Sequence, residues 1–248
     1  MSYERFAYIY DYLMKDVPYD SWIDFVVLQA TENEVKGKQL LDIACGTGEL
    51  SLKLVGEGYH VTGVDLSEDM LQIANEKSIE NGVELSLFQQ DMSKLEGLGE
   101  YDIITIFCDS LNYLETEEDV RRTFECVHHH LKKDGLFMFD IHSIYKMSQI
   151  FMNQTFTYND DQVSYIWDCF PGDAANSVEH ELTFFVKQSS SALYERVEEL
   201  HKQRTYPVNT VCQWLEKAGF TIMSITSDFD LLPPSDQSER IFFTCKIK

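Results

Sequence analysis

The sequence is poor in basic residues. Lysine and arginine together number 20, against 42 aspartates and glutamates, which gives a formal charge of −22 over 248 residues. Proteins that bind nucleic acids normally gather basic side chains on one face, where they displace the counterions of the phosphates. No stretch rich in lysine and arginine occurs here. The composition therefore disfavours an RNA or DNA partner, and the many carboxylates are typical of a protein kept soluble by its charge.

The sequence also lacks the features of secreted, membrane and metal-binding proteins. Its N-terminal segment carries charges throughout, without the apolar core of a signal peptide. The sequence contains no run of 18 apolar residues, so we predict no membrane-spanning helix. The six cysteines are scattered without a C-x-x-C pair, which predicts reduced thiols in the cytoplasm. We expect no metal site, because the consecutive side chains of His128, His129 and His130 would diverge around a helix.

Most of the chain alternates between strand and helix. Such alternation, with nearly continuous apolar strands, is typical of a parallel sheet covered by helices on both faces. We therefore predict a doubly wound α/β core. Its expected strands are 40–44, 59–65, 84–89, 101–107, 134–141, 220–229 and 239–247, and its expected helices are 48–57, one from Ser67 as N-cap, 116–132 and 208–217.

Two segments stand outside this core, which spans 37–150 and 207–248. Residues 1–36 are predicted to form an N-terminal helical lid with aromatic residues along one face, made of helices at 3–14 and 19–33. Residues 151–206 alternate short strands with polar turns, which predicts an antiparallel β insert that caps the substrate site. Its expected turns are Asn159-Asp160-Asp161, Pro171-Gly172-Asp173 and Ser189-Ser190-Ser191.

A glycine-containing turn follows the first strand, at the carboxyl edge where open α/β sheets bind ligands. There Gly46 and Gly48 allow close backbone approach, and the N-terminus of the following helix favours an anionic group. A dinucleotide fingerprint needs a third glycine where Ser51 stands, so this turn disfavours NAD. Asp65 ends the second strand, 19 residues after Gly46, where its carboxylate can accept hydrogen bonds from both hydroxyls of an adenosine ribose.

These residues resemble the class I S-adenosylmethionine (SAM)-dependent methyltransferases over about residues 37–141. LDIACGTGELSLKL (41–54) is similar to motif I of that family, and VDLSEDML (64–71) resembles the segment after it, with Asp65 as the ribose acid. The resemblance implies a seven-stranded Rossmann-like sheet with an antiparallel last strand and SAM as cofactor. The SAM-binding residues that it implies here are Asp42, Ala44, Cys45, Gly46, Gly48, Asp65, Leu66 and Met70.

Two further segments extend this resemblance. QQDM (89–92) is similar to the third-strand motif, which implies that Asp91 contacts the adenine amino group and that Met92 forms an apolar wall. YDIITIFCDSLNYL (101–114) resembles the fourth-strand motif that lines the reaction centre, and it adds Phe107 to the implied SAM-binding residues.

The N-terminal FAYIYDYLM and the β insert resemble small-molecule N-methyltransferases, such as amino-sugar dimethyltransferases and glycine N-methyltransferase. This implies that the hydroxyl of Tyr10 faces the methyl group and that Tyr10 and Trp22 belong to the cofactor site. His142 follows the fifth strand directly and is the candidate general base, and Tyr113 lies beyond the fourth strand as a third catalytic candidate. Alternatively, His142 orders its loop and the tyrosines pack in the core.

The sequence thus favours an enzyme that transfers a methyl group from SAM to a small-molecule acceptor, with nitrogen as the favoured position. Methylation of RNA or protein is the second hypothesis, a non-catalytic SAM-binding protein the third, and an NAD oxidoreductase the fourth. The sequence determines neither the acceptor nor the oligomeric state.

Overall fold

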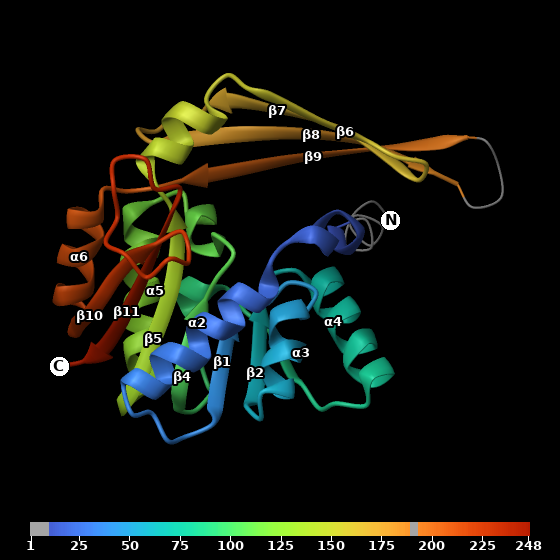
Figure 1. Ribbon diagram of the computed structural model, residues 1–248. Helices are drawn as coiled ribbons and strands as arrows, with labels where there is room; N and C mark the ends of the chain where they lie inside the picture. Colours follow the sequence, from blue (N-terminus) through green and yellow to red (C-terminus); the bar gives the residue numbers. More distant parts are fainter. Residues whose placement is uncertain (1–9, 189–192) are drawn as a thin grey trace.

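The protein is built around a seven-stranded sheet (Figure 1). A computed structural model describes residues 10–188 and 193–248. The strand order is β10-β11-β5-β4-β1-β2-β3, in which β11 runs antiparallel to both of its neighbours and the other pairs are parallel. This order confirms the predicted doubly wound, mostly parallel fold. The strands are β1 Gln39–Ile43, β2 His60–Asp65, β3 Ser86–Gln89, β4 Tyr101–Ile106, β5 Leu131–His142, β10 Phe220–Ser227 and β11 Arg240–Ile247.

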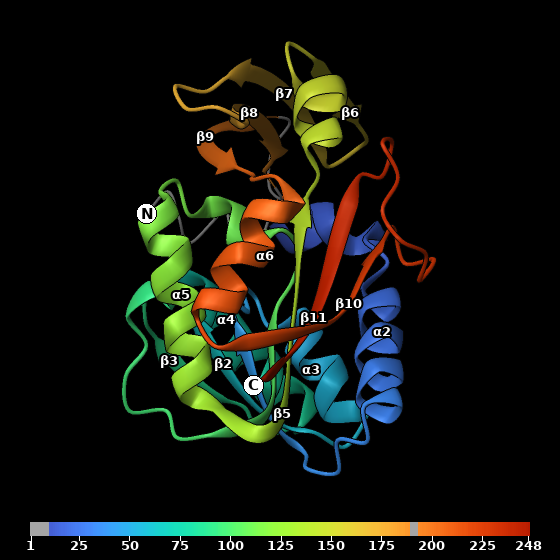
Figure 2. The same cartoon turned by 90° about the vertical axis from the view of Figure 1, so that its left-hand side faces the viewer.

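Helices cover both faces of this sheet (Figure 2). Successive strand residues point to opposite faces, so Leu40 and Leu41, both fully buried, belong to two different apolar clusters. Leu40 packs with α2 (Tyr19–Glu32) and α3 (Glu49–Gly56), and Leu41 packs with α5 (Glu117–His130) and α6 (Val208–Lys217). The near-continuous apolar strands of the sequence are therefore explained by burial on both sides.

The ends of the elements follow local chemistry. Ser67 caps α4 (Glu68–Asn81) as predicted, because its hydroxyl accepts the backbone N–H of Met70. The helix predicted to reach 132 ends at His130, and β5 begins at Leu131. The strand predicted over 220–229 ends at Ser227 because Asp228 and Phe229 take positive φ angles of 51° and 64°, which no strand can continue.

The N-terminal segment lies across the carboxyl edge of the sheet. Residues 10–13 are helical and lead into a short 3-10 turn, η1 (Met14–Asp16), before α2 begins at Tyr19. The rest of the helix predicted over 3–14, including Phe6 and Tyr8, lies outside the described residues. No helix in the described part of the chain combines the length and apolar character that crossing a bilayer requires.

A separate four-stranded antiparallel sheet extends over the carboxyl edge of the main sheet (Figure 1). It is reached from β5 through a π-helical segment, η4 (Lys146–Phe151), which the sequence did not predict. Polar turns separate β6 from β7 and β7 from β8, and the turn expected at Ser189-Ser190-Ser191 lies outside the described residues. The strands are β6 Thr155–Asn159, β7 Val163–Pro171, β8 Ser177–Lys187 and β9 Tyr194–Arg204.

Stacked phenylalanines join the sheet to its helices. Phe139 is fully buried, and its ring centroid lies 4.7 Å from that of Phe243 and 5.5 Å from that of Phe124 on α5. We predict that Phe139→Ala lowers the free energy of unfolding by about 3–5 kcal/mol, because it removes this burial and leaves a cavity. Urea unfolding should show a lower midpoint with an unchanged slope. Phe88→Ala, at a side chain that is 45% exposed, is the control, and an equal loss in both variants would contradict the prediction.

Candidate active site

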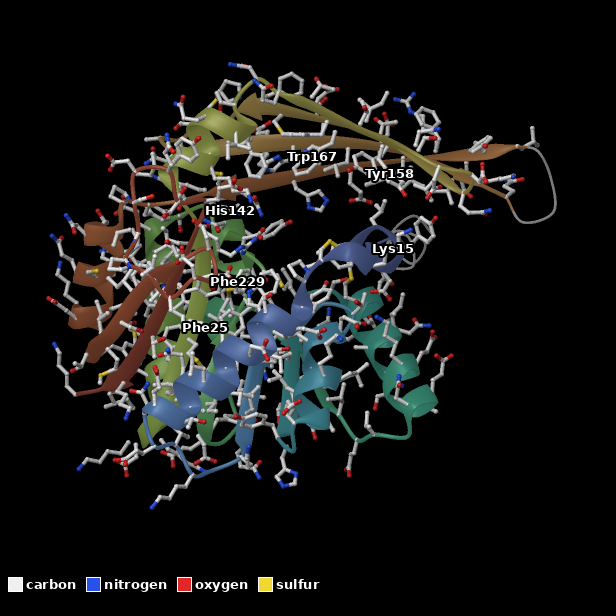
Figure 3. All side chains as sticks on the ribbon, in the orientation of Figure 1. Lys15, Phe25, His142, Tyr158, Trp167 and Phe229 are labelled. Carbon is white, nitrogen blue, oxygen red and sulfur yellow. The ribbon has the colours of Figure 1, made fainter. Side chains whose placement is uncertain are left out.

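A cavity of about 610 Å³ lies where the carboxyl edge of the main sheet meets the antiparallel sheet. It is lined by the N-terminal segment, the glycine turn with the first residues of α3, the loops that follow β4 and β5, the start of β11, and one face of the antiparallel sheet. Figure 3 shows His142 at the top of β5 and Trp167 on the sheet above it. The cavity therefore lies at the sheet edge that the sequence predicts for a ligand.

The glycine turn combines left-handed backbone with open space. Gly46 has a φ of +54°, and a Cβ added there would meet no atom within 4 Å, so its face is open. Gly48 begins α3 with a φ of +76°, and a Cβ there would lie 3.0 Å from the Cβ of Ala74. Gly46 lines the cavity, whereas Gly48 allows α3 and α4 to approach closely.

Asp65 holds this turn in place. Its Oδ2 accepts the backbone N–H of Gly46 at 2.8 Å, and its Oδ1 accepts that of Ser67 at 2.9 Å. Burial raises the pKa of Asp65, although these two N–H groups oppose the rise. Each carboxylate oxygen keeps a second lone pair, so the side chain can still accept hydrogen bonds from a ligand beside Gly46.

Asp42 is a second buried carboxylate at this edge, and it lines the cavity. Its oxygens accept the hydroxyls of Ser51 at 2.5 Å and Thr105 at 3.0 Å. Burial raises the pKa of Asp42 to about 6, against the effect of these hydroxyls. Ser51, which stands where a dinucleotide fingerprint has glycine, thus provides a hydrogen bond to Asp42.

The other predicted cofactor residues divide into two groups. Ala44, Cys45 and Phe107 line the cavity together with Asp42 and Gly46. Asp65, Gly48, Leu66, Met70, Asp91 and Met92 do not line it, although Asp65 reaches it through its bond to Gly46. Leu66 is 68% exposed, and Met70 packs near Phe184 of the antiparallel sheet.

Asp91 and Met92 lie at the turn after β3. Asp91 caps the short helix η2 (Met92–Lys94), because its carboxylate accepts the backbone N–H of Ser93 at 2.9 Å. Burial opposes the ionisation of Asp91, but Lys94 and Ser93 outweigh it and lower its pKa. Met92 is half-buried against the main core.

Trp22 does not join the predicted cofactor residues. It is 3% exposed, its indole N–H donates to Oδ2 of Asp140 at 2.6 Å, and its ring lies edge-on to Phe229 at 4.6 Å. It is absent from the residues that line the cavity. In this structure Trp22 supports Asp140 from within the core, and its place among the cofactor residues stays a prediction.

The three candidate catalytic residues line one cavity although they come from separate parts of the chain. Tyr10 belongs to the N-terminal segment, and burial raises its pKa well above the usual value. Tyr113 ends the short helix η3 (Ser110–Tyr113) and packs edge-on to the ring of His201 at 5.9 Å. His142 is 4% exposed, and burial lowers its pKa despite the nearby carboxylate of Asp109.

A cluster of Asp109, Asp140 and Arg240, here called the carboxylate–arginine cluster, lies beside His142, with Asp140 fully buried and the other two side chains partly buried. The guanidinium of Arg240 donates to Asp109 at 2.8 Å and to Asp140 at 2.6 Å. Asp140 also accepts the backbone N–H groups of Asp109 at 2.7 Å and Cys108 at 3.2 Å. Cys108 and Asp109 have positive φ angles of 54° and 53°, so Asp140 holds a strained turn that presents Asp109 to the cavity.

The antiparallel sheet contacts this cluster through Gln203. The amide Nε2 of Gln203 donates to Oδ2 of Asp109 at 2.8 Å, and its Oε1 lies 3.3 Å from Nε2 of His180. The indole N–H of Trp167 donates to Nδ1 of His180 at 3.0 Å. Burial lowers the pKa of His180 to about 4, so this histidine is neutral near pH 7.

The sequence did not predict the members of this network. Asp109 and Asp140 lie at the carboxyl ends of parallel strands, and Arg240 begins an antiparallel strand, which places all three at the same edge. That topology was a signal that could have identified them. Gln203 could not be identified in this way, because its side of the sheet depends on the register of β8 and β9.

Side chains of the N-terminal segment bond both to the glycine turn and to the antiparallel sheet. The carboxylate of Asp11 accepts the hydroxyl of Thr47 in the glycine turn at 2.5 Å and pairs with Lys77 on α4 at 2.7 Å. The hydroxyl of Tyr12 donates to Asp160, in the turn between β6 and β7, at 2.6 Å. The segment therefore connects the glycine turn to the antiparallel sheet.

The raised pKa of Asp42 predicts a pH-dependent loss of stability. The carboxyl group of Asp42 binds its proton more tightly in the folded state than in the unfolded state. The protonated side chain therefore adds to the free energy of unfolding below the unfolded pKa near 4, and this stabilisation is lost as pH rises through about 6. Asp42→Asn removes this titration. The wild type should therefore lose about 2 kcal/mol relative to Asp42→Asn between pH 4 and pH 7, measured by urea unfolding. The exposed Asp20→Asn controls for loss of one charge, and parallel wild-type and Asp42→Asn curves would contradict the prediction.

Comparison with known proteins identifies the family. Residues 40–135 match a methyltransferase domain. A protein of Geobacillus sp. (strain WCH70) that carries a provisional methyltransferase name is 52% identical over 247 residues, which cover 99% of this chain and 100% of that protein. The crystal structure of a SAM-dependent methyltransferase from Clostridium acetobutylicum ATCC 824 has a TM-score of 0.89 and 34% identity and covers 100% of this chain and 99% of that one.

A sugar N-methyltransferase from Streptoalloteichus sp. ATCC 53650 shares the fold, with a TM-score of 0.76 and 18% identity over 95% of this chain and 91% of that one. The relatives match this chain along nearly its whole length, and they include a solved enzyme that uses SAM. The chain therefore belongs to the SAM-dependent methyltransferases.

Proposed function

We propose that the protein methylates a small-molecule acceptor at nitrogen. The observation that carries this proposal is the cavity itself, which continues from the glycine turn to a space surrounded by aromatic side chains of the N-terminal segment and the antiparallel sheet. Enclosed, mostly apolar cavities with a few polar groups are typical of small-ligand sites. In this proposal residues 1–36 act as a lid, 151–206 as the substrate cap, and 37–150 with 207–248 as the SAM-binding core.

The cofactor half of the proposal rests on the glycine turn. Asp65 would bind the ribose hydroxyls, the open face of Gly46 would admit the cofactor chain, and the buried carboxylate of Asp42 suits its cationic amino end. Asp91 and Met92 would flank the adenine, and Phe107, Ala44 and Cys45 would pack against the cofactor. SAM supplies a methyl group that is already activated on a sulfonium, so these residues need only bind and orient it and exclude water.

The part of the cavity proposed to hold the acceptor is lined by aromatic rings. Among the described residues that line it, each Lys and Arg side chain is paired with a carboxylate. Rings such as Tyr113, Trp167 and Phe184 suit an ammonium or sulfonium group. Arg240 is bound by two carboxylates, and Lys146 pairs with Glu239 at 3.3 Å. These pairs and the charge of −22 favour an amine over a phosphorylated or polyanionic acceptor.

Two further points support the proposal. The sugar N-methyltransferase that shares this fold acts at nitrogen on a small molecule, as its name states. All six cysteines are free thiols, which suits the cytoplasm, where amines and SAM are available. Methylation of RNA or protein remains the second candidate function, and it would require a broad open surface beside the methyl group.

The proposed role of Asp65 predicts a loss of cofactor affinity. Asp65→Ala removes hydrogen bonds from a carboxylate, each worth about 1.5–3 kcal/mol, and should weaken SAM binding at least roughly tenfold. Isothermal titration calorimetry with SAM measures the effect. Glu68→Ala, at an exposed position in the same segment, is the matched control. Unchanged affinity in a folded Asp65→Ala protein would refute the ribose assignment.

The proposed acceptor class predicts a substrate profile. Incubation with SAM carrying a labelled methyl group should label small primary or secondary amines and leave bulk tRNA, ribosomes and protein unlabelled. The aromatic lining of the cavity is the physical reason, because it suits a small amine better than a polyanion such as RNA. Labelling of a macromolecule with none of the amine panel would instead establish the second candidate function.

A further inference from the structure

Asp109 presents the negative charge of the carboxylate–arginine cluster to the cavity. Its side chain lines the cavity and is 19% exposed, whereas the side chain of Asp140 is fully buried. Among the residues that the structure describes, Oδ1 of Asp109 accepts a hydrogen bond only from Arg240, at 2.8 Å. A carboxylate oxygen can accept two hydrogen bonds, so this oxygen keeps a lone pair for a ligand.

The cluster carries one negative charge in excess. Each oxygen of Asp140 accepts two N–H groups, which come from an indole, two backbone amides and the guanidinium of Arg240, and these bonds stabilise its ionised form. His142 is neutral near pH 7, because burial lowers its pKa. Asp109 and Asp140 therefore share the single positive charge of Arg240, and a cationic ligand at Asp109 would balance the charge that remains.

The antiparallel sheet orients this carboxylate through a chain of hydrogen bonds. An indole N–H can only donate, so Nδ1 of His180 accepts the N–H of Trp167 at 3.0 Å. The proton of neutral His180 then lies on Nε2, which is 3.3 Å from Oε1 of Gln203. This contact turns the amide of Gln203 so that its Nε2 donates to Oδ2 of Asp109 at 2.8 Å. Gln203 thus holds Oδ2 from one side while Arg240 holds Oδ1 from the other.

Asp109 lies beside two of the candidate catalytic residues. Burial raises the pKa of both Tyr10 and Tyr113, and the negative charge of Asp109 adds to each rise. An electrostatic effect on both hydroxyls requires the carboxylate to lie near them. All three side chains line the cavity, so a ligand bound to Asp109 would lie among the aromatic rings of its wall.

We propose that Asp109 binds the acceptor: its carboxylate accepts an N–H group of the amine, and Gln203 is the positioning residue that orients the carboxylate for this contact. The inference rests on the proposed function for the transfer of a methyl group to the amine. The binding of an amine by Asp109 can be measured without methyl transfer.

This role narrows the class of acceptor. Although burial opposes its ionisation, His142 and Arg240 hold the pKa of Asp109 well below its usual range, so Asp109 holds the nitrogen without taking its proton. A reacting amine needs one N–H for Asp109 and a free lone pair for the methyl group. Neutral primary and secondary amines have both, whereas a neutral tertiary amine has no N–H. Methylation should therefore stop at the tertiary amine.

The direct test is calorimetric titration of the protein saturated with S-adenosylhomocysteine, which has no methyl group to transfer. The probes are benzylammonium and benzyl alcohol, which share one ring and differ in their charge. The wild type should bind benzylammonium about tenfold more tightly, because a hydrogen bond to a charged group contributes at least that factor. Asp109→Asn should lose this preference and keep its affinity for S-adenosylhomocysteine. Asparagine tolerates a positive φ, so the turn is retained.

Two further variants separate charge from orientation. Asp134→Asn, at an exposed position on β5, is the matched control and should keep the wild-type preference. Gln203→Met keeps the charge of Asp109 and removes its positioning donor, so the preference should fall by about threefold, the effect of one ordinary hydrogen bond. With an amine that is labelled in the substrate panel, Asp109→Asn should raise KM more than it lowers kcat.

Equal affinity of the wild type for the two probes, or binding of neither, would overturn the proposal. An Asp109→Asn protein that keeps the preference would also overturn it, and so would labelling of a tertiary amine by the wild type. If Asp109→Asn does not fold, an unchanged preference in Gln203→Met has the same consequence. A protein that binds benzylammonium through Asp109 and labels no amine would reject the proposed function while retaining Asp109 as the residue that binds the cation.

Discussion

The geometry of the site depends on the compensation of two carboxylates, one fully and one partly buried, by a single guanidinium. Removing a charge from water costs several kcal/mol, and the cost is recovered only where opposite charges and hydrogen bonds are well placed. Arg240 pairs with both Asp109 and Asp140, and the remaining oxygen atoms accept an indole N–H, an amide and two backbone N–H groups. The loop after β4, the end of β5, the start of β11 and α2 therefore meet at one point, and none can move without exposing an unpaired charge.

The carboxylates in the two halves of the cavity, Asp42 near the glycine turn and Asp109 near His142, have opposite electrostatic surroundings. Asp109 has a cationic partner and a pKa below the usual range. Asp42 is bonded only to hydroxyls within the described ranges, and its pKa is raised to about 6. A carboxylate that lacks a positive partner gains from a cationic ligand, so the half near the glycine turn is suited to binding a positive charge. The half near His142 already contains its positive charge, the guanidinium of Arg240.

The sequence predicted the core well because its signals are local. The apolar strands, the cap at Ser67, the glycine turn and Asp65 at the end of β2 each depend on residues close together in the chain. The sequence did not predict the carboxylate–arginine cluster, because Asp109 and Arg240 are brought together by the antiparallel pairing of β11 with β5. The sequence did not predict the contact of Gln203 with Asp109, because the face of the sheet on which Gln203 lies depends on the register of β8 and β9, and local patterns do not determine that register.

The antiparallel sheet leaves and rejoins the core at a single place. The hydroxyl of Thr205 donates to the carbonyl of His142 at 2.5 Å, and Asn112 bonds the backbone of both His142 and Arg204 at 2.9 Å. A segment whose two ends are joined so closely can be lengthened, shortened or exchanged without separating the strands that it connects. Evolution can thus replace the antiparallel sheet, and with it one wall of the cavity, as a unit while the glycine turn and the main sheet are inherited unchanged.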